Sequence, residues 1–389
     1  MRVDATRPLE QAASRVWDVI VVGAGPAGAM AALELARLDA DVLLVDKAAF
    51  PRWKACGCCL NAWGQSTLAL AGLGELVVQL GAVPLSRFIL AVGGRRTELD
   101  IPHSVAISRE SLDSALVQAA IREGAHFIPE TLAQLAPPEP GQRRLVLRQK
   151  SLRRETAARL VLAADGLAGR LIANEPEGEL RIDPASRLGG GLMLDNVGES
   201  DYQREIIYMG AGRHGYVGLV RLGDGRLNLG AAFDAPAVTR LGGLGPAAAA
   251  TLEEAGLPLI GGLYQAAWKG VPPFTRRINK PSGERWLALG DAAGYVEPFT
   301  GEGMAWALAQ GRAIAPIAAE GVREWSSEVG RTWHQAYWQM MAARQKRCRL
   351  VAGALRHPHL VSWLMGALSV FPGMADPLVR GFTLPAVDS

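Results

Sequence analysis

The sequence has little of what would mark a membrane-spanning, secreted or nucleic-acid-binding protein. No run approaches the roughly 20 apolar residues of a spanning helix. The first sixteen residues lack the apolar core and cleavage site of a secretory signal. Lys and Arg outnumber Asp and Glu by only three and are scattered rather than gathered in one stripe. We therefore expect a cytoplasmic protein that does not bind nucleic acid.

Cysteine is also scarce, and three of the four cysteines crowd into positions 56 to 59. Secreted scaffolds spread paired cysteines through a short chain, so a disulfide framework is excluded. The Cys-x-Cys-Cys spacing lacks the two-residue spacer of common zinc sites, and no second Cys/His pair lies at finger-like distance. We expect no metal, and the cluster needs another explanation.

What the sequence does contain is typical of a globular α/β protein: 49% hydrophobic residues, 20% charged residues and 45 glycines. Residues 17–22, 27–38 and 41–45 read as strand, helix and strand, which make a βαβ unit. Helical periodicity returns at 108–123, and a strand-like run follows at 125–128.

The pattern changes between about residues 181 and 281, where short β-like runs alternate with Gly- and Asp-containing turns. These runs, at 206–209, 216–221 and 227–232, predict a separate antiparallel sheet. Elsewhere Pro137, Pro138 and Pro140 indicate a turn, 286–289 a strand and 303–318 a helix. From Thr332 onward the chain reads as helical, with breaks at Pro358 and Pro372.

The turn after the first strand carries glycines at Gly23, Gly25 and Gly28. Glycines here permit a tight turn and let backbone amides approach a pyrophosphate at the helix N-terminus. Asp46 ends the second strand, where a carboxylate can bind ribose hydroxyls. We predict that the pyrophosphate and the ribose of a dinucleotide are held by Gly23, Ala24, Gly25, Pro26, Ala27, Gly28, Asp46 and Lys47.

A second element of this kind lies much later, where Gly290 and Asp291 end a strand and Gly301 to Met304 begin a helix. A strand-end Asp suits a chain of hydroxyls, and a Gly-rich helix start offers unpaired amides. Two such elements imply a long cofactor, because NAD alone would not need the second. The residues predicted to hold it here are Gly290, Asp291, Pro298, Gly301, Gly303 and Met304.

These motifs, spread from about Trp17 to Gln310, resemble the flavoprotein superfamily of aromatic hydroxylases, flavin halogenases and geranylgeranyl reductases. The resemblance implies FAD. It would put Gly23, Gly25 and Gly28 on the ADP part, Asp46 on the adenosine ribose, Arg109 and Asp165 beside the cofactor, Asp291 on the ribityl chain and residues 301–304 near the pyrimidine end. The alternative for Arg109 is a cap or ion pair on a surface helix.

Residues 50–60 resemble the segment that carries a Cys-Gly pair past the isoalloxazine in geranylgeranyl reductases. The resemblance makes Cys56 a catalytic candidate and Gly57 a cofactor-binding one. The thiol could donate a proton, position substrate or tune the ring, with a pKa that responds to charges such as Arg52 or Lys54. The alternatives are small residues simply packed in a loop and a covalent thioether to flavin.

Residues 214–220 and 225–230 resemble the substrate-domain hairpin of the reductases. The Trp-x-Trp-x-Ile-Pro sequence of the halogenases is absent, which disfavours halogenation. Of the Tyr-x-Trp-x-Phe-Pro sequence of prenyl reductases only Tyr216 remains, so prenyl reduction loses part of its support. Tyr208, His214 and Tyr216 are candidates for the substrate side, although aromatic residues on strands more often belong to the core.

Two further features concern the later part of the chain. Glu302 lies between two glycines and could act as acid or base if burial raises its pKa, although a solvated loop carboxylate is the commoner state. Arg344, Lys346, Arg347 and Arg349 precede an apolar run at 360–371. That region could pack on the flavin domain, cap a substrate channel or touch a membrane surface peripherally.

The fold expected from these elements is α/β: a doubly wound, Rossmann-like, three-layer FAD domain with an inserted, mainly antiparallel β substrate domain and a C-terminal helical region. The FAD domain is discontinuous. Its segments are 1–74, 106–184 and 285–320, the substrate domain comprises 75–105 and 185–284, and the helical region 321–389.

The expected function is an FAD-dependent oxidoreductase that acts on a lipophilic small molecule such as an isoprenoid, a polyketide or another secondary metabolite. Hydride transfer at the flavin would make it a reductase or dehydrogenase. A second nucleotide-binding glycine motif is absent, so NADPH or NADH would dock transiently as electron donor. A flavin monooxygenase and a flavin-binding scaffold without turnover are the alternatives.

Overall fold

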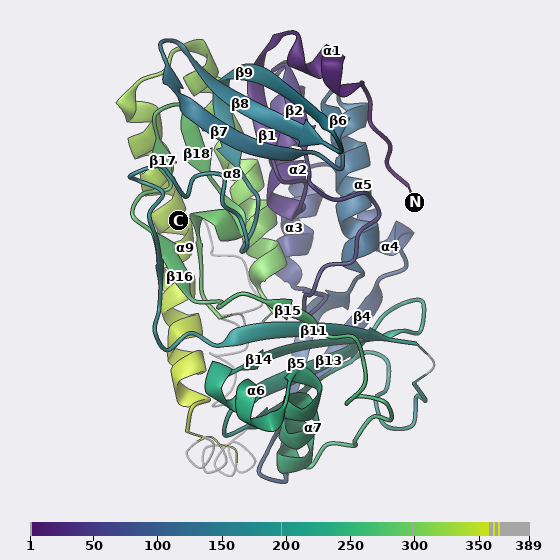
Figure 1. Cartoon of the computed structure of the whole chain (residues 1–389). Coiled ribbons are helices and arrows are strands. Elements are labelled where there is room, and N and C mark those ends of the chain that lie inside the picture. Colours follow the sequence, from purple (N-terminus) through teal and green to yellow (C-terminus); the bar gives the residue numbers. More distant parts are fainter. Residues whose placement is uncertain are drawn as a thin grey trace.

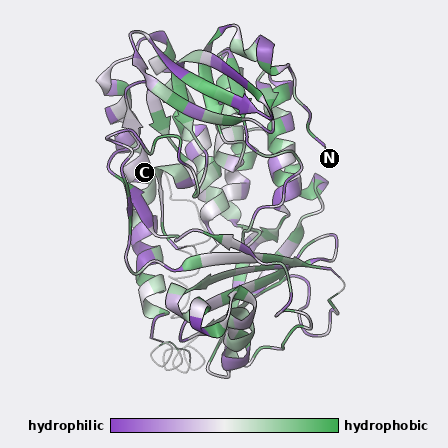
Figure 2. Cartoon of the chain, in the orientation of Figure 1, coloured by the Kyte–Doolittle hydropathy of each residue, from purple (hydrophilic) through white to green (hydrophobic). Residues whose placement is uncertain are grey.

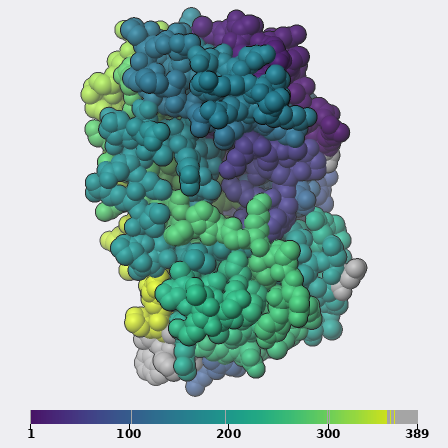
Figure 3. All heavy atoms as spheres, in the orientation of Figure 1, coloured from purple at the N-terminus to yellow at the C-terminus, as the bar shows by residue number. Residues whose placement is uncertain are grey.

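The computed structural model describes residues 2–357, except Asn196, Pro298 and Thr300, together with Val361 and Met365. Two β-sheets lie at opposite ends of an elongated molecule, and a long helix runs along one side of both (Figure 1). In the space-filling view the N-terminal part of the chain lies at one end and the later segment coloured green at the other (Figure 3). None of the helices within the described ranges is long and apolar enough to cross a membrane.

The first sheet is built around β1 (Val16–Val22), which pairs in parallel with β2 (Val42–Val45) and β9 (Leu152–Ala163). β1, β2 and the second half of β9 are largely apolar because both faces of the sheet are covered there (Figure 2). The sheet order is β17-β18-β9-β1-β2-β6, with β6 (His126–Ile128) and β18 (Trp286–Ala288) also parallel and β17 (Ser282–Gly283) at the edge.

Three helices that pack against one another form one layer beside this sheet: α2 (Pro26–Arg37), α5 (Arg109–Arg122) and α8 (Gly303–Arg323). The other layer is an antiparallel ribbon of β7 (Leu132–Glu139), β8 (Gln142–Gln149) and β9, seen in front of the sheet in Figure 1. These layers agree with the expected three-layer architecture.

The turn predicted at Pro137 and Pro138 is wrong, because both residues belong to β7. The chain reverses one step later, at Pro140 and Gly141, where Gly141 has a positive φ of 80°. Within the described sheets β7 pairs only with β8, and its register shifts between Leu135 and Pro138. A proline is tolerated there because an edge strand has N–H groups that need no partner in the sheet.

The second sheet is mainly antiparallel, as expected, but β4 (Val83–Val92) and β12 (Ile206–Gly212) pair in parallel at its middle. Its order is β15-β11-β14-β13-β12-β4-β5-β3. The other strands are β3 (Cys59–Leu60), β5 (Arg95–Ala106), β11 (Leu188–Leu194), β13 (Gly215–Arg221), β14 (Leu227–Phe233) and β15 (Lys269–Val271).

Two helices that the sequence did not lead us to expect cover one face of this sheet: α6 (Ala235–Leu241) and α7 (Leu244–Ala255). Leu252 and the alanines of α7 form a second core with Leu229 and Phe233 of the strands. The remaining elements are α1 (Leu9–Ala13), α3 (Ala62–Leu70), α4 (Leu76–Gln79), β10 (Leu180–Ile182), β16 (Arg276–Ile278), the 3-10 turn η1 (Gly290–Ala293), β19 (Gly294–Tyr295) and α9 (Ser327–Ala354).

The predicted domain boundaries stay a prediction, and the described strands cross them at several points. The strands of the second sheet fall within the segments 75–105 and 185–284, apart from β3, in the segment 1–74, and the last residue of β5. β17 of the first sheet lies in the segment 185–284, and β16 of that segment pairs with β10 and β19, which lie outside it. β3 pairs with β5, so the cysteine segment is attached to the second sheet at its C-terminal end.

Candidate functional site

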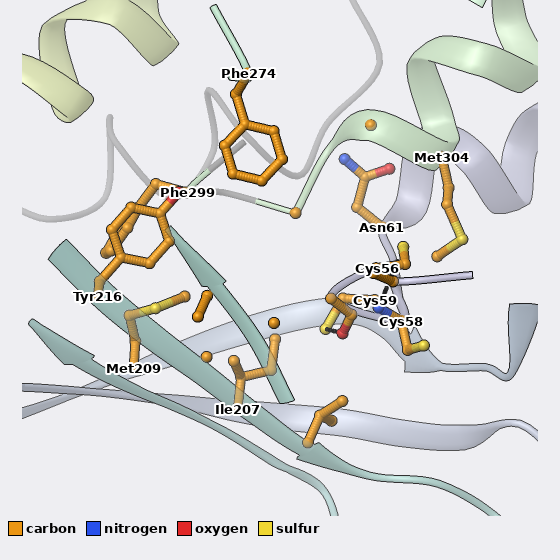
Figure 4. Close-up of a pocket in the computed structure, with 18 of the residues that line it drawn as sticks. Cys56, Cys58, Cys59, Asn61, Ile207, Met209, Tyr216, Phe274, Phe299 and Met304 are labelled. Carbon is orange, nitrogen blue, oxygen red and sulfur yellow. Dashed lines mark hydrogen bonds between the residues drawn. The ribbon is translucent and has the colours of Figure 1, made fainter. Parts of the chain in front are cut away.

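A cavity of about 580 Å³ lies between the two sheets. Its lining includes residues 25–27, residues 54–59 and 61, and several residues between Gly290 and Met304, together with strands of the second sheet and helix α9. Figure 4 shows side chains of the second sheet, among them Ile207, Met209 and Tyr216, facing this space opposite the cysteine segment. The sequence motifs predicted to act together therefore meet at one site.

The glycine turn is shaped by close packing. Gly23 has a φ of +105°, and a Cβ there would lie 2.2 Å from the carbonyl oxygen of Ala164. A Cβ at Gly28 would lie 1.9 Å from the carbonyl oxygen of Gly23. Gly25, by contrast, opens on the cavity as the N-cap of α2, where no side chain caps the helix amides. These free amides suit an anionic group.

Two arginines face the same helix start. A Cβ at Gly25 would meet only the Nη2 atoms of Arg52 and Arg109, at 3.7 and 3.8 Å. Arg109 lines the cavity and is buried, with two 2.8 Å hydrogen bonds to Asp113. Arg52 lies 3.3 Å from Asp113. Burial lowers the pKa of Arg109, but Asp113 and Cys56 outweigh it and raise the pKa above its ordinary value. Arg109 is thus no surface ion pair. The glycines of the turn, the free amides of α2 and the two guanidinium groups, which are held by Asp113 and Asp46, form a cradle that fits a pyrophosphate.

Asp46 and Lys47 lie beside this cradle but do not line the cavity. The Asp46 carboxylate accepts hydrogen bonds from the backbone N–H groups of Ala24, at 2.8 Å, and Ala48, at 2.9 Å. It therefore fixes the turn in addition to its predicted ribose contact. Lys47 is exposed.

Asp165 is also outside the cavity lining, which its neighbours Gly166 and Leu167 form. Its Oδ2 accepts the N–H groups of Arg170 and Leu171, at 2.8 and 2.9 Å. Burial raises the pKa of this carboxyl despite those bonds. The Asp165 side chain thus stabilises the loop from 165 to 171, and a contact with the cofactor stays a prediction.

All three clustered cysteines line the cavity. The pKa of Cys56 is lowered to about 5, by a hydrogen bond from the thiol of Cys58 and by the charge of Arg109, against the effect of burial. Arg109, rather than Arg52 or Lys54, is thus the cation that faces this thiol. Lys54 is itself in the cavity, where burial and then Arg109 lower its pKa.

The second glycine element closes the cavity from the other side. Gly290 adopts a φ of +62° and donates its N–H to Oε1 of Gln310, at 2.8 Å. It lines the cavity together with Asp291, Gly301, Gly303 and Met304. Gly57 also lines it, and a Cβ added there would meet no atom within 4 Å. Pro298, also predicted here, lies outside the described residues.

Glu302 differs from the expectation of a solvated carboxylate. It is only 1% exposed, lies 3.4 Å from Nη1 of Arg344 and within 3.5 Å of the sulfur of Cys348. It does not line the cavity. Arg344 in turn lies over the ring of Trp63, at 3.8 Å from the ring centroid. Glu302 therefore joins α9 to the start of α8, and its role as acid or base stays a prediction.

Tyr216 faces the cavity and has a buried acidic partner that the sequence did not predict. Its side chain is hydrogen-bonded to Glu297, and burial first and then this carboxylate raise its pKa well above the ordinary value. Glu297 is 2% exposed and lies 3.1 Å from Arg187, which is fully buried. The sequence does not predict this pair because Tyr216 and Glu297 are 81 positions apart and share no motif.

Two other candidates lie elsewhere. His214 is in the turn between β12 and β13, with its Nε2 2.9 Å from Arg240, and does not line the cavity. Tyr208 belongs to the second core, where its ring packs edge-on against Tyr202. Successive side chains along a strand point to opposite faces of the sheet. Tyr208 and Tyr216 therefore belong to one hairpin but face the second core and the cavity, respectively.

The half of the cavity away from the glycine turns is apolar. Its walls come from the second sheet, from Phe274 and Phe299, and from α9 and the residues after it. The side chains that form it include Phe88, Leu90, Ile101, Ile207, Met209, Leu350, Leu355, Val361 and Met365. No group of three His, Cys, Asp or Glu residues within the described ranges is arranged to hold a metal ion.

Comparisons with known proteins agree with this geometry. The FAD binding domain family matches residues 16–180. A menaquinone reductase of Mycobacterium tuberculosis is 28% identical over 345 residues, which cover 81% of this chain and 78% of the relative. A digeranylgeranylglycerophospholipid reductase of Methanopyrus kandleri is 30% identical over 319 residues, covering 79% and 82%.

Solved structures confirm the fold. The flavin-dependent brominase Bmp2 superposes with a TM-score of 0.77 at 16% identity, over 95% of this chain and 94% of the other. A flavoprotein/dehydrogenase from Cytophaga hutchinsonii superposes with a TM-score of 0.73 at 17% identity, over 88% and 86%. At such identities the likeness concerns the fold and not the reaction.

Proposed function

This chain belongs to the superfamily of FAD-dependent oxidoreductases that contains the geranylgeranyl reductases, and we propose that it is a reductase or dehydrogenase of a lipophilic small molecule with an isoprenoid-like chain. That it is an FAD-dependent oxidoreductase follows from its FAD binding domain and its reductase relatives. The narrower proposal concerns the reaction and the substrate.

The observation that carries the proposal is the continuity of the cavity. One end has the glycine turns and the buried Arg109, and the other has aliphatic and aromatic side chains from the second sheet and α9. A site of this shape can hold a long apolar molecule with one end at the cofactor. The relatives' names, which refer to menaquinone and to digeranylgeranyl lipids, support the same class of substrate.

The residues that would hold FAD are those of the cradle. Gly25 to Ala27 with Arg52 and Arg109 suit the pyrophosphate, Asp46 the adenosine ribose, and Asp291 the ribityl hydroxyls. Gly57, Gly301, Gly303 and Met304 surround the space left for the ring. Bound FAD supplies two-electron redox chemistry, taking up or giving a hydride.

The chain's own part in reduction is to position the substrate and supply a proton. Cys56, with a pKa of about 5, is ionised at neutral pH and so holds a negative charge rather than a proton. Tyr216 keeps its proton, because burial and Glu297 raise its pKa. We assign proton donation to Tyr216 because its side chain faces the cavity, with Glu297 and Arg187 holding it in place.

The electron donor and the cellular position are part of the proposal. We propose that NADPH or NADH docks transiently, and that the protein is cytoplasmic and meets its substrate at a membrane surface. The exposed basic residues of α9 near Leu350, which is 66% exposed, support a peripheral contact with anionic lipid.

The test begins with an absorbance spectrum of the purified protein and anaerobic addition of NADPH, NADH or dithionite. The reduced protein then receives menaquinone or a geranylgeranyl lipid in detergent micelles, and the products are analysed by mass spectrometry. The proposal requires yellow flavin and a product that gains two hydrogens without oxygen.

Incorporation of oxygen from air would instead identify a monooxygenase. Flavin that no donor reduces and no lipid reoxidises would leave only a binding role.

A further inference from the structure

Cys56 and Cys58 lie in direct contact at the cavity wall. The backbone N–H of Cys58 points at the Cys56 sulfur, at 3.5 Å, and the thiol of Cys58 is hydrogen-bonded to the same sulfur. Figure 4 shows both side chains on the loop that faces the second sheet. The contact depends on the backbone of Cys58, which has a φ of +56°, a left-handed conformation that few non-glycine residues adopt.

The two thiols differ in protonation. Cys58 and Arg109 lower the pKa of Cys56, whereas the hydrogen bond to Cys56 and burial raise the pKa of Cys58. The pair therefore has one thiolate and one thiol in contact at neutral pH. A thiolate beside a second thiol is the arrangement from which disulfides form and exchange.

The third cysteine of the cluster is placed differently. The thiol of Cys59 donates to the carbonyl oxygen of Gly57, at 3.2 Å, and burial raises its pKa to about 12. Cys59 also begins β3, which pairs with β5. It lines the same cavity but is fixed as a thiol, so it serves as the matched control.

We propose that Cys56 and Cys58 form a redox-active dithiol–disulfide couple that exchanges two electrons with oxidised FAD in this cavity. The inference rests on the proposed placement of FAD. In the oxidation an S–S bond forms between the Cys56 thiolate and the Cys58 sulfur, and the one remaining S–H hydrogen, that of Cys58, is lost as a proton. The two electrons and this proton are taken up by the oxidised cofactor, which balances the step.

The couple is suited to reversible exchange. A disulfide between residues separated only by Gly57 closes a very short loop, and strained disulfides are the more easily reduced ones. A Cβ added at Gly57 would meet no atom within 4 Å, so the loop has room to adjust. The protein would store a second pair of electrons next to the flavin.

The test is an anaerobic reductive titration of the FAD-loaded protein, followed by alkylation and mass spectrometry of the cysteines. We expect the oxidised wild-type protein to take up twice as many electrons per flavin as Cys58→Ser. Cys59→Ser should match the wild type. A peptide with a Cys56–Cys58 disulfide should be present before the titration and absent after it.

The proposal is overturned if Cys58→Ser takes up as many electrons as the wild type, or if no disulfide forms in glutathione buffers across the accessible potentials. The outcome is independent of the proposed function. Lipid reduction is measured separately on the same samples, and it can fail while the couple titrates, or succeed while Cys58 stays reduced.

Discussion

At Arg109 one guanidinium serves two neighbours. It is held by Asp113 one helical turn later and faces both the start of α2 and the thiol of Cys56. The anion site and the thiolate are therefore electrostatically linked, because both depend on the same buried positive charge.

Removing that charge should change both properties. In Arg109→Gln we expect FAD to bind about ten- to a hundredfold more weakly, the usual effect of losing a charge-assisted hydrogen bond. The pKa of Cys56 should rise from about 5 towards its ordinary value of 9.0. Because the folded pKa is depressed, thiolate stabilisation is complete above pH 9 and is lost as the pH falls towards 5.

The measurement is the rate of Cys56 alkylation against pH, with FAD affinity from fluorescence. Arg122→Gln, an exposed position on the same helix, is the control. An unchanged alkylation profile in Arg109→Gln would show that Arg109 does not set the charge of Cys56.

Glu297 offers a second prediction at this scale. In Glu297→Gln the pKa of Tyr216 should fall, because the buried negative charge that helps to raise it is gone. If Tyr216 donates the proton, activity is lost as the pH rises through this pKa. We expect the alkaline limb of the kcat/KM profile to move to lower pH than in the wild type, while activity at neutral pH, where Tyr216 stays protonated because of burial, is kept.

Glu254→Gln removes an exposed partner of Arg213 and should leave that profile unchanged. A Tyr216→Phe variant with wild-type turnover would refute the proton donor itself.

The glycine turns and Asp291 could be predicted because each lies in a short motif whose spacing carries the signal, whereas Cys56 and Arg109 were implied by the resemblance to the flavoprotein superfamily. The sequence could not predict Glu297, whose role depends on contacts with Arg187 and Tyr216 in distant parts of the chain. His214 failed for the converse reason. Its neighbours in sequence are strand residues at the cavity, but its own side chain faces Arg240 at the surface.

Among the elements, the contact of α2 with α8 determines how the first glycine turn meets the second. Gly311 of α8 lies against α2 so closely that a Cβ there would be 2.3 Å from the carbonyl oxygen of Ala27. That oxygen belongs to the first turn of α2, which also lines the cavity.

Gly311→Val should therefore separate the two helices. We expect a loss of about 1–3 kcal/mol in the free energy of unfolding, measured with denaturant, and a lower FAD content. Gly353→Val on α9 is the control, since nothing in the described structure lies within 4 Å of its Cβ position. There the expected change is below about 0.5 kcal/mol.

The elements of the first sheet were predictable because continuous apolar runs and a glycine turn mark them. Helix α7 was missed, although its run of alanines favours a helix, because it lies in the stretch 181–281, which was interpreted as short strands and turns. It is stabilised by packing on β12 and β13, a tertiary effect absent from local sequence.

At the scale of the whole molecule, the cavity has a polar half from the first sheet and its helices and an apolar half from the second sheet and α9. This division predicts that the two ligands can be separated by mutation. Ile207→Trp fills the apolar half from β12 and leaves the glycine turns untouched.

We expect Ile207→Trp to bind FAD as the wild type does and to lose at least about tenfold in kcat/KM for long lipophilic substrates. Short analogues should be affected less. Val78→Trp, at a site 71% exposed, is the control. A parallel loss of FAD would mean that the two halves are not independent.

The sequence predicted the glycine turns and the strands that form the two halves of the cavity, but it did not predict how the two halves are connected. The connection is the pairing of β3, in the cysteine segment, with β5, more than thirty residues later in the chain. Such pairings cannot be read from local periodicity.

The strand order also has a consequence for biosynthesis. The second sheet is complete only when β15 has been made, at Val271, and the first only when β18 has been made, at Ala288. On the ribosome the first sheet therefore stays incomplete while all strands of the second sheet are translated. During this time β9 lacks β18, its neighbour on the side away from β1. A nascent chain that stalls before Trp286 leaves the edge of β9 unpaired, and chaperones would find their binding surface there.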